Sequence, residues 1–341
     1  MIIRKHMTDV LVWGIFCALL IVCFTGANVI KQYSSISLRY SSPISGRDAY
    51  AARQYSVARN DQITFWPTFW REYKASFSAT FVTVEANCIA FSGDASKVLP
   101  VKFITGSAPG ILDSNGCAVS EALAWLLWGS TDVVGMDVEV GGEVRVVRGV
   151  FEGYGELALV PYSDEDTAGS WSAVELSGGP DNVVRKDAES FAVTSGLGMP
   201  DQTLMGGEVP LAIAIAVLPL LIPAIYGLWS FVQYIRKRYP IVKKLIPFLI
   251  LFAFATLLPI ILGVLPEWII PTRWSDFSFW RDLFKQAAKS LRVFLSISPQ
   301  TRDVELRMLL INHACVTLLS ACAGFAVIKQ NKPRSRTTGF Y

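Results

Sequence analysis

Four long apolar segments constrain this chain more than any other feature of its sequence. They are residues 10–30, 209–235, 245–270 and 308–328. Each can cross a bilayer core as an α-helix, which takes roughly 20 apolar residues. Only 17% of the 341 residues are charged and the mean hydropathy is +0.40, whereas a soluble domain averages about 25% charged residues. The sequence therefore predicts an α-helical membrane protein with four transmembrane helices.

The first apolar segment has a competing interpretation, because the basic start MIIRKHM also suits a cleaved signal peptide. Its apolar run is longer than the roughly 7–15 residues of such a peptide, and its cleavage site is poor. Cys23 follows Val22, where a lipoprotein site needs a small residue. We therefore predict that residues 1–30 form a short head and the first transmembrane helix.

The distribution of Lys and Arg predicts the orientation of the helices. Basic residues are concentrated in the head, in the loop 236–244 and in the C-terminal tail. With four spans these three segments share one side, which the positive-inside rule identifies as cytoplasmic. Residues 31–208 then lie outside and carry 22 acidic against 13 basic residues. Both termini are therefore predicted to be cytoplasmic, with a large domain on the other side of the membrane.

The spans divide the chain into five parts. These are the head and first helix, 1–30; an extracytoplasmic domain, 31–208; the second and third helices with the basic loop, 209–270; an outside loop with an amphipathic helix, 271–307; and the fourth helix with a basic tail, 308–341. The amphipathic helix has apolar residues at helical spacing from Trp280 to Leu295, so it either lies in the outer membrane interface or packs under the outside domain.

Two features within the spans have two interpretations each. Six prolines in the second and third spans suit kinks packed within a bundle, and a moving hinge is the alternative. His313, next to Asn312 in the fourth span, suits a hydrogen bond between helices, and a functional role is the alternative.

The outside domain is predicted to have an α+β fold. Its Ser-rich start, 31–56, is predicted to be a stalk or irregular segment. The aromatic stretch 63–73 is predicted to pack on the domain or the membrane interface, or to contact an apolar ligand. Alternating patterns predict strands, which are 78–91, 98–106, 155–162 and 171–176. The pattern of 182–193 predicts an amphipathic helix.

The middle of the domain carries the clearest local signals. Residues 117–129 begin as a strand and become a helix, with Ser120 as its N-cap and Gly129 as its stop. Residues 137–153 form two alternating strands joined at Gly141-Gly142, which predicts a β-hairpin.

Several kinds of chemistry are excluded by what this sequence lacks. The segment LSGGP, 176–180, differs by one residue from the LSGGQ signature of ABC ATPases, but none of the 25 glycines is followed by lysine. Without a GxxxxGK[ST] loop the chain lacks the backbone amides and the lysine that bind the phosphates of ATP. The Ser-Gly-Gly-Pro part of LSGGP is instead predicted to be a turn. Residues 31–208 contain no histidine and no GxSxG motif, which argues against an ectoenzyme. No catalytic residue, metal site or cofactor is predicted, and the acidic outside domain argues against nucleic-acid binding.

The run 116–153 resembles the extracytoplasmic core domain of MacB/FtsX-type ABC-transporter permeases. The matching residues are Ser120-Glu121, Trp128-Gly129, Asp132-Val133-Val134-Gly135 and Val147-Arg148-Gly149-Val150. The match covers about 55 residues when the preceding segment 98–109 is included, and the layout of one span, a large outside domain and three spans is similar to that family. The resemblance implies a permease subunit in a bacterial cytoplasmic (inner) membrane. It would be a homodimer or paired with a sister permease, and would be driven by a separate ABC ATPase subunit.

The cytoplasmic loop departs from the family pattern. In the family this loop carries a longer motif with acidic and glycine residues that meets the ATPase, whereas here it is only RKRYPIVKK. Its basic residues are Arg236, Lys237, Arg238, Lys243 and Lys244. They either set the topology or contact an ATPase or anionic lipid. A second function therefore stays open: a non-transport membrane protein whose outside domain is a binding or sensing module.

Cys88 and Cys117 both lie in the outside domain on predicted strands. An oxidising exterior permits a disulfide between them if their Cα atoms lie within about 7 Å. Two buried thiols are the alternative.

Overall fold

The computed structural model describes residues 2–33, 35–58, 65–79, 81–163, 170–178, 185–204, 277–282, 285, 288, 292 and 300–330. The chain divides into two compact units. The helical unit comprises Met1–Lys31, Pro210–Phe279 and Arg307–Tyr341, and the sheet unit comprises Gln32–Val209 and Trp280–Leu306. The second and third predicted spans, the basic loop between them and the C-terminal tail beyond residue 330 lie outside the described residues.

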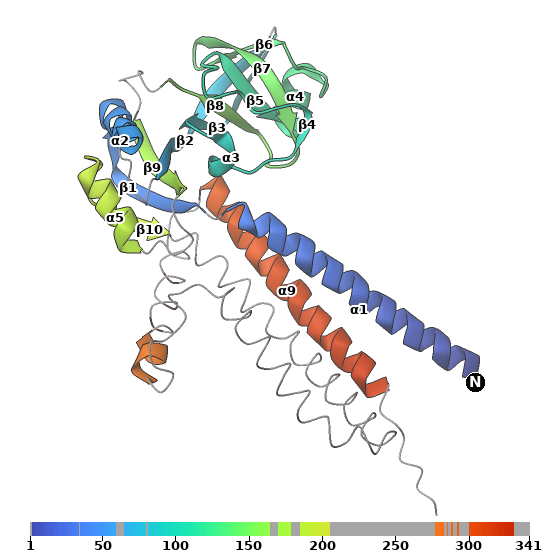
Figure 1. The fold of residues 1–341 in the computed structure, drawn as a ribbon. Helices are drawn as coiled ribbons and strands as arrows, with labels where there is room; N and C mark the ends of the chain where they lie inside the picture. The colour runs from blue at the N-terminus through green and yellow to red at the C-terminus, as the bar shows by residue number, and fades with distance from the viewer. Residues whose placement is uncertain are drawn as a thin grey trace, which may run out of the picture. The chain divides into compact units, whose positions relative to one another are not determined.

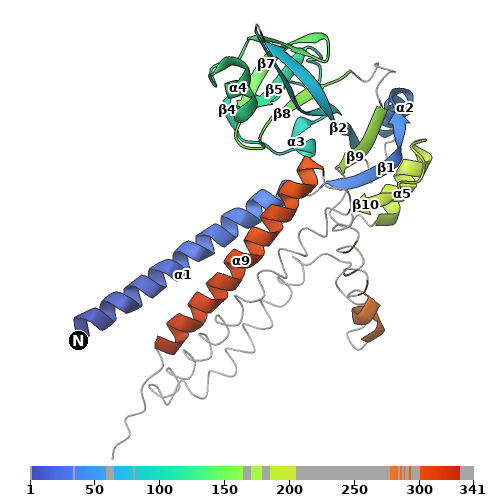
Figure 2. The same ribbon diagram turned by 180° about the vertical axis from the view of Figure 1, so that it is seen from behind.

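Two long helices lie side by side in the helical unit (Figures 1 and 2). They are α1, Ile2–Lys31, and α9, Thr301–Gln330, whose first residues belong to the sheet unit. Cys23 Sγ on α1 lies 3.7 Å from Thr317 Oγ1 and 3.5 Å from Ser320 Oγ on α9. Among the described residues, one helix, Thr301–Ala326, is long and apolar enough to cross a membrane, and Gly14–Ile30 of α1 is a shorter apolar helix.

His313 is buried against α1, where a Cβ placed on Gly26 would lie 3.2 Å from its Nδ1 atom. Small residues at such positions let two helices approach closely. Neither ring nitrogen of His313 has a hydrogen-bond partner among the described residues. The hydrogen bond predicted for it between helices is therefore not formed with α1.

One ten-stranded sheet forms the framework of the sheet unit. Its strands are β1 (Ile36–Ser45), β2 (Trp66–Ala79), β3 (Val82–Ser92), β4 (Phe103–Gly106), β5 (Gly116–Ser120), β6 (Asp137–Val140), β7 (Glu143–Phe151), β8 (Leu157–Pro161), β9 (Ser170–Ser177) and β10 (Gln202–Leu204). The order is β10-β1-β9-β2-β3-β8-β5-β7-β4, and β6 pairs with β2 and β7. The pairs β3·β8 and β5·β7 are parallel, and the other pairs are antiparallel.

Strand β6 closes part of this sheet into a ring. It pairs with β7, and it also pairs with β2 at Phe77↔Val140 and Ser78↔Glu139. Because β2 is connected to β7 through β3, β8 and β5, six strands form a closed path. Helix α4, Glu121–Trp128, packs on the apolar core of the ring, which includes Phe77. Closure of the ring removes free strand edges among these six strands.

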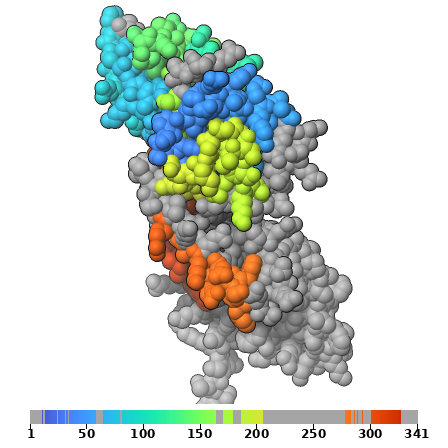
Figure 3. Space-filling view, turned by 90° about the vertical axis from the view of Figure 1, so that its left-hand side faces the viewer, coloured from blue at the N-terminus to red at the C-terminus, as the bar shows by residue number. Residues whose placement is uncertain are grey.

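The open part of the sheet is covered by two helices on one face. Helix α2, Gly46–Ala58, and helix α5, Arg185–Thr194, share an apolar cluster with β1, β2 and β9. The ring centroid of Phe191 lies 5.9 Å from that of Tyr55 and 5.4 Å from that of Phe65. Figure 3 shows α2 and β1 in blue beside α5 in yellow-green. Helices α2 and α5 do not cover the opposite face of β1, β2 and β9.

The local predictions in the middle of the domain are confirmed. Ser120 is the N-cap of α4 and its side chain accepts a hydrogen bond from the Leu123 amide, while Gly129 ends the helix in the left-handed conformation. Gly141 and Gly142, both at positive φ, join β6 to β7. These features depend on neighbouring residues alone, which is why the sequence reveals them. The α+β fold predicted for the domain is confirmed as well.

The predicted stalk is wrong. Residues 36–45 form β1, an inner strand between β10 and β9, and Gly46–Ala58 form α2. Alternate residues of β1 face the two sides of the sheet. Ser37 and Arg39 lie on one side, where they contact Glu175 and Asp303. A polar strand therefore has the composition of an irregular segment. The aromatic stretch 63–73 packs in the domain as predicted, since Phe65, Phe69 and Trp70 are buried.

Two other predicted segments are described only in part. The predicted amphipathic helix in the loop 271–307 is helical at its described residues 277–282, 285, 288 and 292. Of LSGGP, Leu176 and Ser177 end β9 and Gly178 has a φ of 80°, while residues 179–180 lie outside the described residues.

Gly149 of the motif Val147–Val150 has a steric explanation. A Cβ at this position would lie 2.5 Å from the Ser107 carbonyl oxygen and 2.8 Å from the Phe103 ring. Glycine in a strand interior often marks such a close approach. The glycine lets β4 and the following loop pack tightly on β7.

Cys88 and Cys117 are both free and fully buried. Cys88 lies on β3 and Cys117 on β5, and β8 lies between these strands. Strands two positions apart in a sheet are separated by about 9.5 Å, which exceeds the Cα separation of a disulfide. The alternative of two buried thiols is the one that the structure supports. Burial raises the pKa of Cys88 to about 11 and that of Cys117 to about 12.

We expect both thiols to resist alkylation in the native chain at pH 8 and to react only after unfolding. The thiol form is the one that the fold stabilises, because both pKa values are raised above the ordinary value of 9.0. This contribution to stability is present below pH 9 and is lost as the pH rises towards 11 and 12. Each thiol should lower the free energy of unfolding by about 1.4 kcal/mol per pH unit in that window.

Mass spectrometry after maleimide treatment checks the alkylation, and near-UV circular dichroism at pH 8, 9 and 10 checks the stability. The control is the variant C88A/C117A, which should lose stability less steeply above pH 9. Rapid alkylation of both cysteines in the folded chain would contradict the prediction.

Candidate functional site

Four charged residues form a buried cluster on the face of the sheet opposite to α2 and α5. Arg39 on β1, Glu175 on β9, and Arg302 and Asp303 in the first turn of α9 are at most 7% exposed. We call them the charge cluster. All four belong to the sheet unit. In Figures 1 and 2, α9 begins beside β1, where the cluster lies. Two positive and two negative charges balance, as burial of charges requires.

Strand register places the sheet residues of the cluster in two adjacent rows. Ser37 and Glu175 are partners across β1 and β9, while Arg39 and Trp70 are both partners of Ala173. The small side chain of Ala173 leaves space between its two larger neighbours. The Arg39 guanidinium carbon lies 4.5 Å from the centroid of the Trp70 ring, a favourable distance for a cation over an aromatic face.

The Glu175 carboxylate is the acceptor at the centre of the cluster. Its Oε1 accepts hydrogen bonds from Ser37 Oγ at 2.6 Å and Trp70 Nε1 at 3.0 Å. Its Oε2 accepts one from Ser35 Oγ at 2.7 Å and lies 3.1 Å from Arg302 Nη2. Hydrogen bonds to a charged acceptor are among the stronger ones in proteins. Both oxygens of this fully buried carboxylate are therefore satisfied.

Arg39 connects the sheet to the start of α9. Its Nη2 lies 2.8 Å from Asp303 Oδ1 and 3.9 Å from Glu175 Oε1, and its Nη1 donates a hydrogen bond to the Gln300 side chain. Burial lowers the pKa of Arg39 from its usual value, and Asp303 and Glu175 act in the opposite direction. Asp303 Oδ2 has no hydrogen-bond partner among the described residues. One carboxylate oxygen of Asp303 thus lacks a hydrogen bond among the described residues, whereas both oxygens of Glu175 accept hydrogen bonds.

The sheet also caps the first turn of α9. Glu72 on β2 accepts hydrogen bonds from the Thr301 amide at 2.8 Å and from Thr301 Oγ1 at 2.5 Å. The first amides of a helix have no partner within the helix, and negative charge near them is stabilising. Helix α9 therefore begins at Thr301, before the predicted span 308–328, because a strand distant in sequence supplies its cap.

Tyr33 and Tyr154 extend the cluster towards the ring of strands. Tyr33 lies two residues after the end of α1, shares a hydrogen bond with the side chain of Tyr154, and has the Arg302 guanidinium 5.4 Å from its ring centroid. Burial, with Tyr154 beside it, raises the pKa of Tyr33. Tyr154, between β7 and β8, has a φ of 67°. Such a conformation is uncommon for a residue other than glycine and is held by its surroundings.

The cluster is suited to holding segments together and not to chemistry on a substrate. Its charged groups are paired and buried, so water and substrate do not reach them. Removing one partner of such a pair costs about 3–5 kcal/mol because the other charge is left uncompensated. Among the described residues, no group of three or more His, Cys, Asp or Glu side chains could hold a metal ion.

Sequence reasoning missed all four residues of the charge cluster. The available signal was a charged residue within an apolar strand, such as Glu175 between Val174 and Leu176. That signal does not indicate which residue would pair with the buried charge. The residues that the sequence did single out, Arg236, Lys237, Arg238, Lys243 and Lys244, lie outside the described residues.

Comparisons with known proteins give similarities to solved structures at low identity. No protein-family model matches the sequence. A search of curated proteins likewise gives no match. Among solved structures, the chain is similar to the extracellular domain of the noncanonic ABC-type transporter YknZ from Gram-positive bacteria, at 14% identity and a TM-score of 0.36, covering 46% of this chain and 87% of that one.

Two further solved structures are similar to this chain. The periplasmic region of MacB from Actinobacillus actinomycetemcomitans is 14% identical, with a TM-score of 0.42, over 53% of this chain and 92% of that one. A domain of a protein described as a permease from Porphyromonas gingivalis is 16% identical, with a TM-score of 0.36, over 50% of this chain and 86% of that one.

Proposed function

We propose that this chain is the transmembrane subunit of an ABC-type transporter or mechanotransmission complex, driven by a separate ATPase subunit. In this proposal it spans a bacterial cytoplasmic (inner) membrane four times with both termini inside. The sheet unit lies outside, and the chain acts as a homodimer or with a sister permease. It is not an enzyme, and ATP is hydrolysed by the partner. The motif in residues 116–153 and the predicted layout of the spans support this assignment.

The observation that carries the proposal is the charge cluster. It joins the segment between α1 and the middle of β1, through Ser35, Ser37 and Arg39, to the first turn of α9 in one buried network. These two helices contain the first and last predicted spans. A movement of either span towards or away from the sheet would act directly on this network. Coupling between membrane helices and an outside domain requires such a firm attachment.

The test is a pull-down of the full-length chain in mild detergent, with mass spectrometry of every protein that contains a GxxxxGK[ST] loop. We expect an ABC ATPase in stoichiometric amount. Recovery of a folded, intact chain without any such ATPase would contradict the proposal.

We expect reversal of the five charges at Arg236, Lys237, Arg238, Lys243 and Lys244 to reduce ATPase recovery at least tenfold. The basic side chains are proposed to meet acidic groups of the ATPase, and like charges would repel across that contact. The matched control reverses four basic residues on the same predicted side of the membrane, Lys329, Lys332, Arg334 and Arg336, and should leave recovery unchanged. A collapse of expression and topology in the loop variant alone would mean that these residues only set orientation.

A second function is favoured by the short loop RKRYPIVKK, which lacks the acidic and glycine residues of the family motif. In this alternative the chain is a membrane protein without transport activity whose outside domain binds or senses a ligand. The same pull-down separates the two functions, because only the first requires an ATPase.

A further inference from the structure

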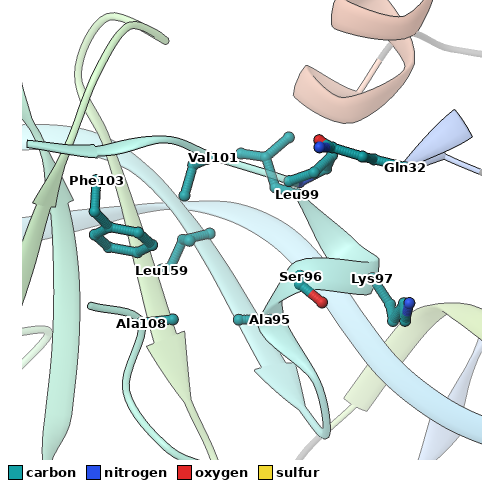
Figure 4. Close-up of a pocket in the computed structure, with 10 residues that line it drawn as sticks. Gln32, Ala95, Ser96, Lys97, Leu99, Val101, Phe103, Ala108 and Leu159 are labelled. Carbon is teal, nitrogen blue, oxygen red and sulfur yellow. The ribbon is translucent and has the colours of Figure 1, made fainter. Parts of the chain in front are cut away.

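A pocket of about 330 Å³ lies in the sheet unit, away from the charge cluster. Its apolar lining includes Leu159 of β8, Leu99 and Phe103, and Leu159 and Leu99 are fully buried. In Figure 4, Phe103 and Leu159 lie on one side of the pocket, and Gln32, Ser96 and Lys97 on the other. The volume is at the lower end of the range for small-molecule sites, about 300–1,000 Å³. It is therefore large enough for one narrow apolar group.

The polar residues of the lining carry positive charge and hydrogen-bond donors but no carboxylate. Lys97 belongs to the short helix α3, Ala95–Val98, and forms no ion pair with any described residue. The acid nearest to it in the sequence, Asp94, already accepts hydrogen bonds from the Ser96 amide and hydroxyl as the N-cap of α3. A half-buried lysine at the edge of an apolar pocket favours a ligand whose polar end is negative.

The wall of the pocket is continuous with the core of the unit. Ala95, Leu99 and Leu159 belong to the same apolar cluster as Trp70. The Trp70 side chain in turn donates to Glu175 of the charge cluster. A ligand in the pocket would thus pack on the apolar cluster that supports the charge cluster. Binding to the folded state alone would also stabilise the sheet unit by mass action.

We propose that this pocket binds one acyl chain of an anionic amphiphile, with its negative head group at Lys97. The apolar lining removes the chain from water, and the Lys97 ammonium pairs with the head group. Gln32, which directly follows Lys31 at the end of α1, provides amide donors on the same side of the pocket. The site goes beyond the proposed transport function and does not depend on it.

Equilibrium binding of radiolabelled dodecanoate to the full-length chain tests the proposal, with the chain held in nanodiscs of neutral phosphatidylcholine and empty nanodiscs as the blank. We expect saturable binding of one dodecanoate per chain. Dodecanol has the chain without the charge and should bind about tenfold more weakly, since a charge-assisted hydrogen bond contributes about that factor. Acetate has the charge without the chain and should not compete.

Two pairs of variants separate the site from its surroundings. Lys97→Met should weaken dodecanoate binding about tenfold and leave dodecanol binding unchanged, because only the ion pair is lost. Its control is Lys102→Met, which removes an exposed lysine paired with Glu152. Ala108→Trp should fill the pocket and abolish binding of both probes. Its control is Ile111→Trp on the same loop, where the side chain is 67% exposed.

The outcomes decide the proposal and the source of the ligand. Equal binding of dodecanoate and dodecanol to the wild-type chain, or undiminished binding to both Lys97→Met and Ala108→Trp, would overturn the assignment. Adding phosphatidylglycerol to the nanodiscs distinguishes the sources: competition with dodecanoate identifies a membrane lipid, and no competition identifies a free fatty acid. Near-UV circular dichroism of Ala108→Trp establishes that the variant is folded, and Lys97→Met tests the site if it is not.

Discussion

Replacing Glu175 with Gln is expected to lower the free energy of unfolding of the sheet unit by about 3–5 kcal/mol. The carboxylate accepts from Ser35, Ser37 and Trp70 and pairs with Arg302. A Gln amide has one acceptor oxygen, and its NH₂ group would face donors. Arg302 would also lose its ion-pair partner, because Asp303 pairs with Arg39. The size of the effect follows from leaving buried positive charge without compensation.

Hydrogen exchange of β1 and β9 in the full-length chain measures this change. The matched control is Glu152→Gln, in which the lost ion pair with Lys102 is exposed and contributes less than about 1 kcal/mol. A second control replaces all four charged residues with apolar ones, as Arg39→Met, Glu175→Leu, Arg302→Met and Asp303→Leu. This variant should recover most of the free energy of unfolding, because no buried charge is left without a partner. A Glu175→Gln variant as stable as Glu152→Gln would refute the assigned role.

Replacing Asp303 with Asn is expected to release the first turn of α9 and to leave the ring of strands intact. Arg39 would lose its partner at 2.8 Å and keep only Glu175 at 3.9 Å. The helix would also lose a negative charge near its N-terminus, where such a charge is stabilising. The local free energy of opening should fall by about 3 kcal/mol. The ion pair of Asp303 is made with Arg39 on β1, which is not a strand of the ring, so the ring should be unaffected.

Hydrogen exchange followed by mass spectrometry resolves the two regions in one experiment. Amides of residues 300–306 should exchange about a hundredfold faster in Asp303→Asn, as about 3 kcal/mol corresponds to two factors of ten. Amides of β3, β5 and β8 should keep their rates. The control is Asp137→Asn, the same substitution at the exposed start of β6. Uniform acceleration over the whole sheet unit would contradict a local role. If the proposed coupling holds, Asp303→Asn should also uncouple the partner ATPase while still binding it.

The charge cluster shows the limit of reading this chain as a sequence. Ser35 and Glu175 are 140 positions apart, and Arg39 and Asp303 are 264 positions apart. Nothing in the neighbourhood of any one of these residues indicates its partner. The strand that carries Arg39, β1, is also predicted wrongly, because its polar face has the composition of a stalk. The pairing of β6 with β2, which closes the ring, is hidden for the same reason.

The sequence by itself determined what short-range physics encodes. Ser120 and Gly129 bound a helix, and Gly141-Gly142 make a hairpin, because each of these signals lies within a few residues. Only the tertiary structure decided that Cys88 and Cys117 stay apart, that six strands form a ring, and that Arg39, Glu175, Arg302 and Asp303 meet. Those outcomes depend on strand order and register, which are set by packing the whole chain at once. Buried charges in particular are stable only when their distant partners are already in place.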